Sequence, residues 1–178
     1  MLRLSVHGNN RAVLAVARYL AEALGRRLLT FVGAKLSRTA CHVTTAHACS
    51  PLKIGHGAAT VMAMPECYAP CLLPWRVLSC AANAFMTVED QDAVGLVNRL
   101  AWPAIGDPPF VEGESGEAGL AGAIRAASSP AIRTALRLDA TSRVLVFSAE
   151  SATVPDLYRQ LVGHSPDEVS VGQGAATS

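Results

Sequence analysis

Short strand-like segments alternate with longer helix-like segments along almost the whole of this chain. The strand-like segments are apolar runs bounded by turn residues, and the helix-like segments repeat apolar residues every three or four positions. We expect strands at 2–6, 28–32, 84–86 and 143–148, and helices at 11–24, 37–48, 74–82, 87–101, 153–163 and from 129 onward. Such alternation is typical of parallel sheets with crossover helices. The sequence therefore predicts an α/β fold, with a three-layer, mostly parallel twisted sheet and helices on both faces.

Composition narrows the class of protein further. The chain has 178 residues and a formal net charge of +1, which fits one domain and provides no basic surface for nucleic acid. No apolar run is long enough to span a membrane, and no signal-peptide core follows Met1. Five cysteines, an odd number, indicate reduced thiols, so we expect a cytoplasmic protein. We assign 1–163 to the domain and expect a disordered tail at 164–178, where small and polar residues predominate.

A glycine-rich turn in 108–122 is the most distinctive local pattern. We expect a short buried strand that contains Val111, then a tight turn with Glu114 and Ser115, then a helix of small residues. The N–H groups of such a helix start and the serine hydroxyl would meet at one point, which suits an anionic or phosphorylated ligand. A plain strand-to-helix turn with a serine N-cap explains the same residues and stays open as an alternative.

Polar or glycine turns follow three of the predicted strands, at 7–10, 114–116 and 148–151. Ligands of parallel α/β sheets bind outside the carboxyl ends of the strands. If these three turns line one crevice, they form a binding site. The pattern alone does not identify the chemistry of that site.

Other residue clusters give weaker signals. The cysteine and histidine spacings fit no closed metal motif, so we expect no metal site; the residues concerned are Cys41, His42, His47, Cys49, Cys67 and Cys71. A catalytic cysteine–histidine pair is also disfavoured, because no partner for Cys71 is identifiable. We expect Trp75 in the core or an interface rather than stacked on a ligand.

The segment 106–120, GDPPFVEGESGEAGL, resembles diaminopropionate ammonia-lyase, a pyridoxal-phosphate family of the tryptophan-synthase-β fold type, fold type II. The resemblance continues in 84–90, 136–150 and 155–163, and it covers roughly 8–163 with the motifs in family order. It implies the C-terminal portion of that enzyme, which contains part of the large domain. The implied family reaction is the α,β-elimination of 2,3-diaminopropionate to pyruvate and ammonia, with pyridoxal 5'-phosphate as the electron sink.

The resemblance also implies seven cofactor-binding residues. A glycine loop would hold the cofactor phosphate, a polar turn would lie near the cofactor, and a serine at a late strand end would contact the pyridine nitrogen. The phosphate loop would consist of Gly8, Asn9, Asn10 and Arg11. The polar turn would contain Glu114 and Ser115, and the serine at the strand end would be Ser148.

The lysine that holds the cofactor as a Schiff base lies, in this family, in an N-terminal region without a counterpart here. The only lysines are Lys35 and Lys53, and neither matches the family position. Asn10 and Arg11 stand where the family's phosphate loop has glycines, although Arg11 is able to pair with a phosphate. We therefore assign no catalytic residue and expect that this chain alone does not bind the cofactor covalently.

Two classes of function stay open. In the first, the chain acts in an ammonia-lyase on a small amino-acid substrate, as a homodimer or with a complementary N-terminal chain that brings the lysine. In the second, it is an inactive, truncated remnant that binds a partner without catalysis. A small-molecule binding module without chemistry is a third possibility.

Overall fold

Four strands form a parallel sheet at the centre of the fold. A computed structural model describes residues 2–6, 29–36, 41–55, 68–70, 72–104, 107–114, 116–146 and 151–175. The sheet has the order β3-β2-β1-β4 and every neighbouring pair is parallel; the strands are β1 (Leu2–Val6), β2 (Leu29–Leu36), β3 (Ala84–Val88) and β4 (Arg143–Val146). Because all neighbours are parallel, their carboxyl ends lie at one edge of the sheet. The predicted α/β class is confirmed, whereas helices on both faces stay a prediction.

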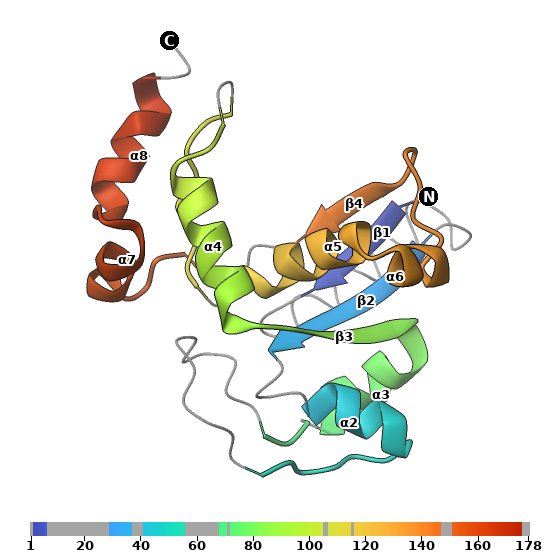
Figure 1. Cartoon of the computed structure of the whole chain (residues 1–178). Coiled ribbons are helices and arrows are strands. Elements are labelled where there is room, and N and C mark those ends of the chain that lie inside the picture. Colours follow the sequence, from blue (N-terminus) through green and yellow to red (C-terminus); the bar gives the residue numbers. More distant parts are fainter. Residues whose placement is uncertain are drawn as a thin grey trace.

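Seven helices are described around this sheet. They are α2 (Cys41–Ala48), α3 (Leu72–Ala81), α4 (Asp90–Ala101), α5 (Ala118–Ser128), α6 (Pro130–Ala135), α7 (Pro155–Val162) and α8 (Pro166–Ala175). Figure 1 shows α5 lying over one face of the sheet, with α6 after it, while α7 and α8 stand next to α4. The helix predicted at 11–24 lies outside the described residues.

The start of α3 differs from the prediction. The helix begins at Leu72 rather than at Pro74, so the proline occupies the third helical position. An N–H at this position has no partner within the helix, so proline costs no hydrogen bond there. The pattern had placed proline at the first position, which is the more frequent location.

The start of α4 also differs from the prediction, because β3 extends to Val88 instead of ending at Met86. Glu89 is the N-cap, and its side chain and that of Asp92 form a capping box. The Glu89 N–H donates to Asp92 Oδ2 at 3.1 Å. A capping box therefore begins α4, two residues later than the expected start of the helix.

One predicted strand is absent and another, confirmed over its described residues, is less buried than expected. Residues 107–114 form no strand, because Pro108 and Pro109 have no N–H to offer a neighbouring strand. The strand predicted at 143–148 as clearly buried is described as Arg143–Val146, and Val144 is 48% exposed. Among the described strands β4 has only β1 as a neighbour, which leaves its side chains less covered than those of a central strand.

The tail predicted at 164–178 is also wrong up to residue 175, because Pro166–Ala175 form the helix α8. Ser165 and Glu168 form reciprocal hydrogen bonds at its start: the Ser165 N–H donates to Glu168 Oε2 at 2.7 Å and the Glu168 N–H donates to Ser165 Oγ at 3.2 Å. Val169 is 2% exposed and packs in the core cluster of α4 and α7. Buried apolar contact and a capped start fix this segment.

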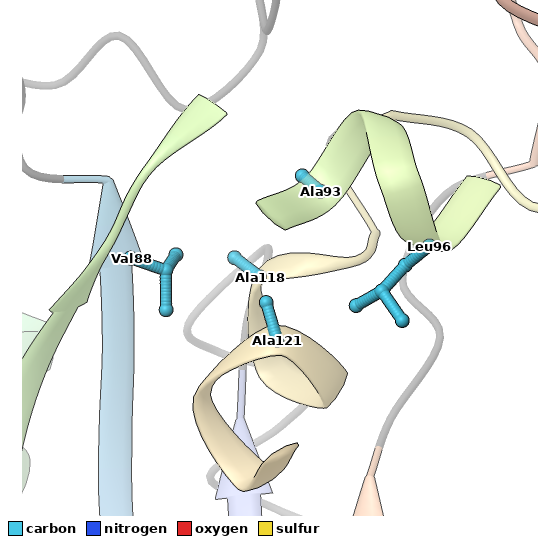
Figure 2. Packing of buried hydrophobic residues seen from close by; sticks show 5 residues of the cluster. All are labelled: Val88, Ala93, Leu96, Ala118 and Ala121. Carbon is cyan, nitrogen blue, oxygen red and sulfur yellow. The ribbon is translucent and has the colours of Figure 1, made fainter. Parts of the chain in front are cut away.

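Two apolar clusters place α4 between α5 and α7. The first joins the end of β3 to α4 and α5 and consists of Val88, Ala93, Leu96, Ala118 and Ala121 (Figure 2). The second joins α4 to α7 and α8 and consists of Val97, Ala101, Tyr158, Val162 and Val169. Small alanines in the first cluster allow α4 and α5 to approach closely. The same cluster fixes where α5 begins relative to the sheet.

Candidate functional site

Two of the predicted polar turns follow, in the sequence, strands that end side by side at the carboxyl edge of the sheet. Ser5 of β1 pairs with Val146 of β4 in a parallel register, so the segments that follow both strands leave from adjacent positions at this edge. These segments contain most of the predicted cofactor residues. Six of the seven lie outside the described residues, and they are Gly8, Asn9, Asn10, Arg11, Ser115 and Ser148.

The turn that contains Glu114, the seventh predicted residue, lies at the same edge. Ala118, the first residue of α5, packs with Val88, the last residue of β3 (Figure 2). The turn before α5 therefore lies next to the carboxyl end of β3, although it does not follow a strand itself. The Gly116 N–H donates to the Gly113 carbonyl at 3.1 Å, which closes the turn.

Three glutamates of this turn are buried, and the sequence interpretation had singled out only one of them. Glu112 and Glu114 are each 4% exposed and Glu117 is 1% exposed. Buried carboxylates are uncommon, so three within six residues are a strong sign of a site. The sequence signal was the density of acidic residues between glycines, which in isolation resembles an exposed acidic loop.

Glu117 has the most unusual environment of the three. It is the N-cap residue of α5, yet its backbone is helical and its side chain makes no capping hydrogen bond. Its Oε1 atom is buried without a hydrogen-bond partner. Burial, and then the nearby charge of Glu112, raises the pKa of Glu117 to about 8. At neutral pH this carboxyl group therefore holds a proton.

These carboxyl groups change the expected ligand of the turn. The sequence predicted an anionic ligand at the start of α5, but buried acidic side chains already occupy this end of the helix dipole. A phosphate would meet carboxylates there, whereas an amine would be attracted. Within the described ranges no group of three His, Cys, Asp or Glu residues could hold a metal ion.

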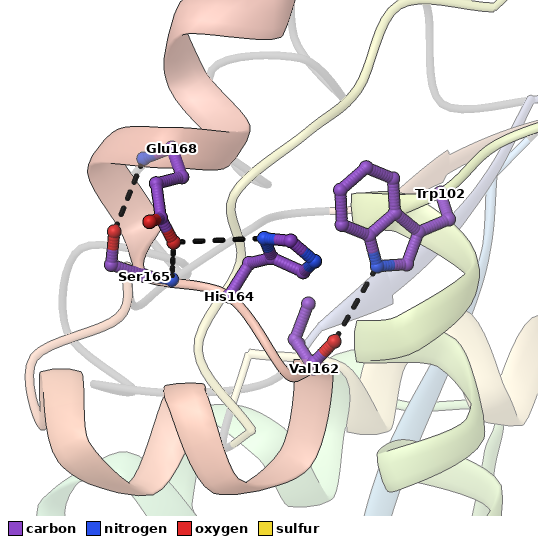
Figure 3. A network of polar contacts seen from close by, with 5 residues as sticks. All are labelled: Trp102, Val162, His164, Ser165 and Glu168. Carbon is purple, nitrogen blue, oxygen red and sulfur yellow. Dashed lines mark hydrogen bonds and ion pairs between the residues drawn. The ribbon is translucent and has the colours of Figure 1, made fainter.

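A second polar network, far along the chain from this turn, is structural. Trp102 Nε1 donates to the Val162 carbonyl at 3.5 Å, and the His164 ring meets the Trp102 ring edge-on at 4.9 Å (Figure 3). His164 Nδ1 lies 3.6 Å from Glu168 Oε2. These contacts hold the start of α8 against α4.

The described helices also bear on membrane association. None of the helices within the described part of the chain combines the length and the apolar character needed to cross a bilayer.

Comparison with known proteins identifies the relatives of this chain. No family model matches the sequence. A diaminopropionate ammonia-lyase of Salmonella typhimurium (strain LT2) is 32% identical over 108 residues, which are 58% of this chain and 27% of the relative. An Escherichia coli diaminopropionate ammonia-lyase, solved with an aminoacrylate-PLP azomethine reaction intermediate, superposes with a TM-score of 0.75 at 24% identity. That superposition covers 90% of this chain and 41% of the enzyme.

The fold extends to other relatives. Maize serine racemase superposes with a TM-score of 0.65 at 14% identity, over 90% of this chain and 47% of the racemase. The resemblance to diaminopropionate ammonia-lyase that the sequence predicted is confirmed, and the E. coli enzyme binds pyridoxal phosphate as part of its reaction intermediate. The chain spans less than half the length of the relatives it matches.

Proposed function

We propose that this chain forms the C-terminal part of a pyridoxal-phosphate site that eliminates ammonia from 2,3-diaminopropionate. The observation that carries the proposal is the carboxyl edge of the sheet, where the ends of β1 and β4 adjoin and the acidic turn before α5 lies beside β3. Both the order of the motifs and the fold over 90% of the chain agree with the E. coli enzyme. The cofactor, when bound, supplies the electron sink for the elimination.

One buried oxygen among the described residues fits such a ligand. Glu117 Oε1 is a buried oxygen without a partner, and a buried polar atom of this kind is expected to meet a ligand. The acidic turn would repel the cofactor phosphate, so we assign the phosphate to Gly8, Asn9, Asn10 and Arg11, which follow β1. Ser148, which follows the adjacent β4, would then face the pyridine ring, with Glu114 and Ser115 beside it.

The substrate chemistry agrees with the charge of the turn. 2,3-Diaminopropionate carries two amino groups, and an acidic, buried turn would attract and orient an ammonium group. The carboxyl proton of Glu117 would then lie near the amino group that leaves as ammonia. Burial of the turn would also exclude water from this side of the site.

We propose that the lysine that links the cofactor comes from elsewhere in the complete assembly. Lys35 lies one residue before the end of β2, at the carboxyl edge, in register with Thr87 of β3. Lys53 is exposed in the segment after α2. We propose that the rest of the fold, in the same or a complementary polypeptide, provides the linking lysine, and that the active assembly is a dimer of such units.

A non-catalytic binding protein is the second candidate. The observation that favours it is the replacement of two glycines of the family's phosphate loop by Asn10 and Arg11. Both candidates would bind the same ligands, and they differ in turnover. Ammonia release from 2,3-diaminopropionate by the complete assembly would exclude the non-catalytic reading.

The proposal is tested by adding pyridoxal phosphate to the chain, reducing with borohydride and mapping labelled lysines by mass spectrometry. We expect saturable binding of the cofactor without a stoichiometric label on either lysine. The matched variants Lys35→Arg and Lys53→Arg identify any labelled residue. A single, stoichiometric label on Lys35 would show that the end of β2 supplies the linking amine. Diffuse labelling without saturable binding would refute the proposal.

A further inference from the structure

The strand β4 has the sequence of a central strand, but it lies at an edge of the described sheet. Three consecutive apolar residues, Val144, Leu145 and Val146, follow Arg143 in this strand. Continuous apolar runs are typical of parallel strands that are covered on both faces. Among the described strands, however, β4 pairs only with β1, and Figure 1 shows it as the last strand on its side of the sheet. Val144 is accordingly 48% exposed.

The opposite edge of the sheet, formed by β3, is covered by the chain itself. The Phe85 ring of β3 lies 5.8 Å from the Trp75 ring of α3. Val88, the last residue of β3, is completely buried and packs with α4 and α5. Figure 1 shows α2 and α3 next to β3, whereas no described helix stands beyond β4. The exposed valine therefore distinguishes the edge at β4 from the edge at β3.

The chemistry of an edge strand selects what covers it. Such a strand directs a row of backbone N–H and C=O groups outward, and a further extended polypeptide satisfies both kinds of group at once. Soluble proteins usually protect an exposed edge with lysine, proline or a bulge. The strand β4 contains neither lysine nor proline, and its one charged residue, Arg143, is at its start. This edge is therefore suited to pairing with another strand.

The relatives indicate where that strand comes from. The E. coli enzyme superposes over 90% of this chain, yet the chain accounts for 41% of the enzyme. More than half of that fold therefore has no counterpart in this chain. A second copy of the chain is a poorer match, because two copies of β4 related by a two-fold axis would pair antiparallel. All described pairs of this sheet are parallel.

We propose that the outer edge of β4 is the interface with the rest of the fold and pairs with a parallel strand from it. The identity of this occupant rests on the proposed function, which assigns the rest of the fold to the same or a complementary polypeptide. The added strand covers Val144 and pairs with the outward backbone groups of β4. Because it is parallel, its carboxyl end reaches the same edge of the sheet as the end of β4. The sequence position of Ser148, two residues after Val146, is therefore next to this interface.

The test is co-expression of the chain with an affinity-tagged form of the part of the E. coli enzyme that the superposition leaves uncovered. We expect the chain to be recovered with the tagged part in a one-to-one ratio. Val144→Lys should reduce the recovered amount about tenfold or more, because the interface would bury an unpaired charge. Val144→Ile keeps a branched apolar side chain and should be recovered like the unmodified chain. Val171→Lys is the matched control, since this valine of α8 is 76% exposed.

Two measurements separate the interface from an effect on folding. Urea denaturation of the isolated variants should show that Val144→Lys is as stable as Val171→Lys, because both side chains are exposed in the chain alone. Hydrogen exchange should show that alternate amides of β4 become protected in the complex. No recovery of the unmodified chain, equal recovery of Val144→Lys, or unchanged exchange in β4 would overturn the interface. Self-association of the chain alone that Val144→Lys abolishes would assign the edge to a second copy and would also overturn it.

The interface and the proposed function fail in different ways. A complex that forms through Val144 but does not bind pyridoxal phosphate saturably supports the interface and contradicts the proposed function. Saturable binding of pyridoxamine 5'-phosphate by the chain, with no complex recovered, overturns the interface alone.

Discussion

Replacing Glu117 with glutamine should stabilise the fold at alkaline pH. The pKa of Glu117 rises from 4.5 to about 8 in the folded chain, first through burial and then through Glu112. Between these values the folded state binds more protons than the unfolded state, so the free energy of unfolding falls as pH rises. The contribution is fully present below pH 4.5 and is lost by about pH 8. Glutamine at this position does not titrate, so the variant does not lose stability in this way as the pH rises.

The size of the effect follows from the shift. A change in pKa from 4.5 to about 8 corresponds to about 5 kcal/mol at 1.36 kcal/mol per unit. Relative to Glu117→Gln, the unmodified chain should therefore lose up to about 5 kcal/mol between pH 4.5 and 8, which is comparable to the total stability of a small domain. Above about pH 8 the difference between the two chains should be constant.

Urea denaturation followed by far-UV circular dichroism, from about pH 5 to about pH 9, measures this difference. Glu112→Gln should reduce the slope, because it removes the like charge but keeps the burial. Asp107→Asn is the control, since its carboxylate is exposed. If the difference in the free energy of unfolding between Glu117→Gln and the unmodified chain does not change with pH across this range, the pKa of Glu117 is not raised in the folded state.

Three further predictions concern helix starts and the C-terminal helix. Ser129→Ala removes the oxygen that accepts the Ile132 N–H and should cost about 1 kcal/mol in urea denaturation. Val169→Ala should cost roughly 2 kcal/mol, because this side chain is 2% exposed, whereas Val171→Ala, at a side chain 76% exposed, should cost almost nothing. The Ser165 N–H lowers the pKa of Glu168, so the hydrogen-exchange protection factors of α8 should fall as acid protonates Glu168.

Matched variants decide these three outcomes. Ser128→Ala removes an exposed hydroxyl next to the N-cap and should leave stability unchanged, so equal losses in both serine variants would exclude a capping role for Ser129. Equal losses in the two valine variants would mean that α8 does not dock through Val169. Glu168→Gln should abolish the loss of protection in α8 at acid pH, and persistence of that loss would assign it to another group.

Local signals in the sequence predicted much of the fold. Ser129 followed by Pro130 begins α6 as the pattern required, and Gly163 ends α7 with a positive φ of 84°. These devices act within a few residues, so sequence alone is sufficient to read them. The resemblance to the lyase family extended the prediction to the whole fold. Several motifs in the same order as in the family identify a whole fold, whereas a single turn identifies only local structure.

Other features depend on contacts between distant residues, which sequence patterns do not contain. The segment after His164 looked disordered from its small and polar composition, yet Ser165 and Glu168 cap a helix that Val169 anchors. Burial of Glu112 and Glu117 follows from the packing of α5 against β3 and α4. Because acidic residues between glycines are usually exposed, local reasoning passed over both glutamates.

Equilibrium dialysis with pyridoxamine 5'-phosphate measures whether the carboxyl edge of the sheet binds the cofactor. This form of the cofactor has an amine in place of the aldehyde, so it reports the pocket at the sheet edge without any linkage to a lysine. We expect saturation at one molecule per chain, with affinity reduced about tenfold in Ser148→Ala and unchanged in Ser128→Ala. Binding that does not saturate, or that is equally strong in both variants, would contradict a cofactor pocket between the ends of β1 and β4.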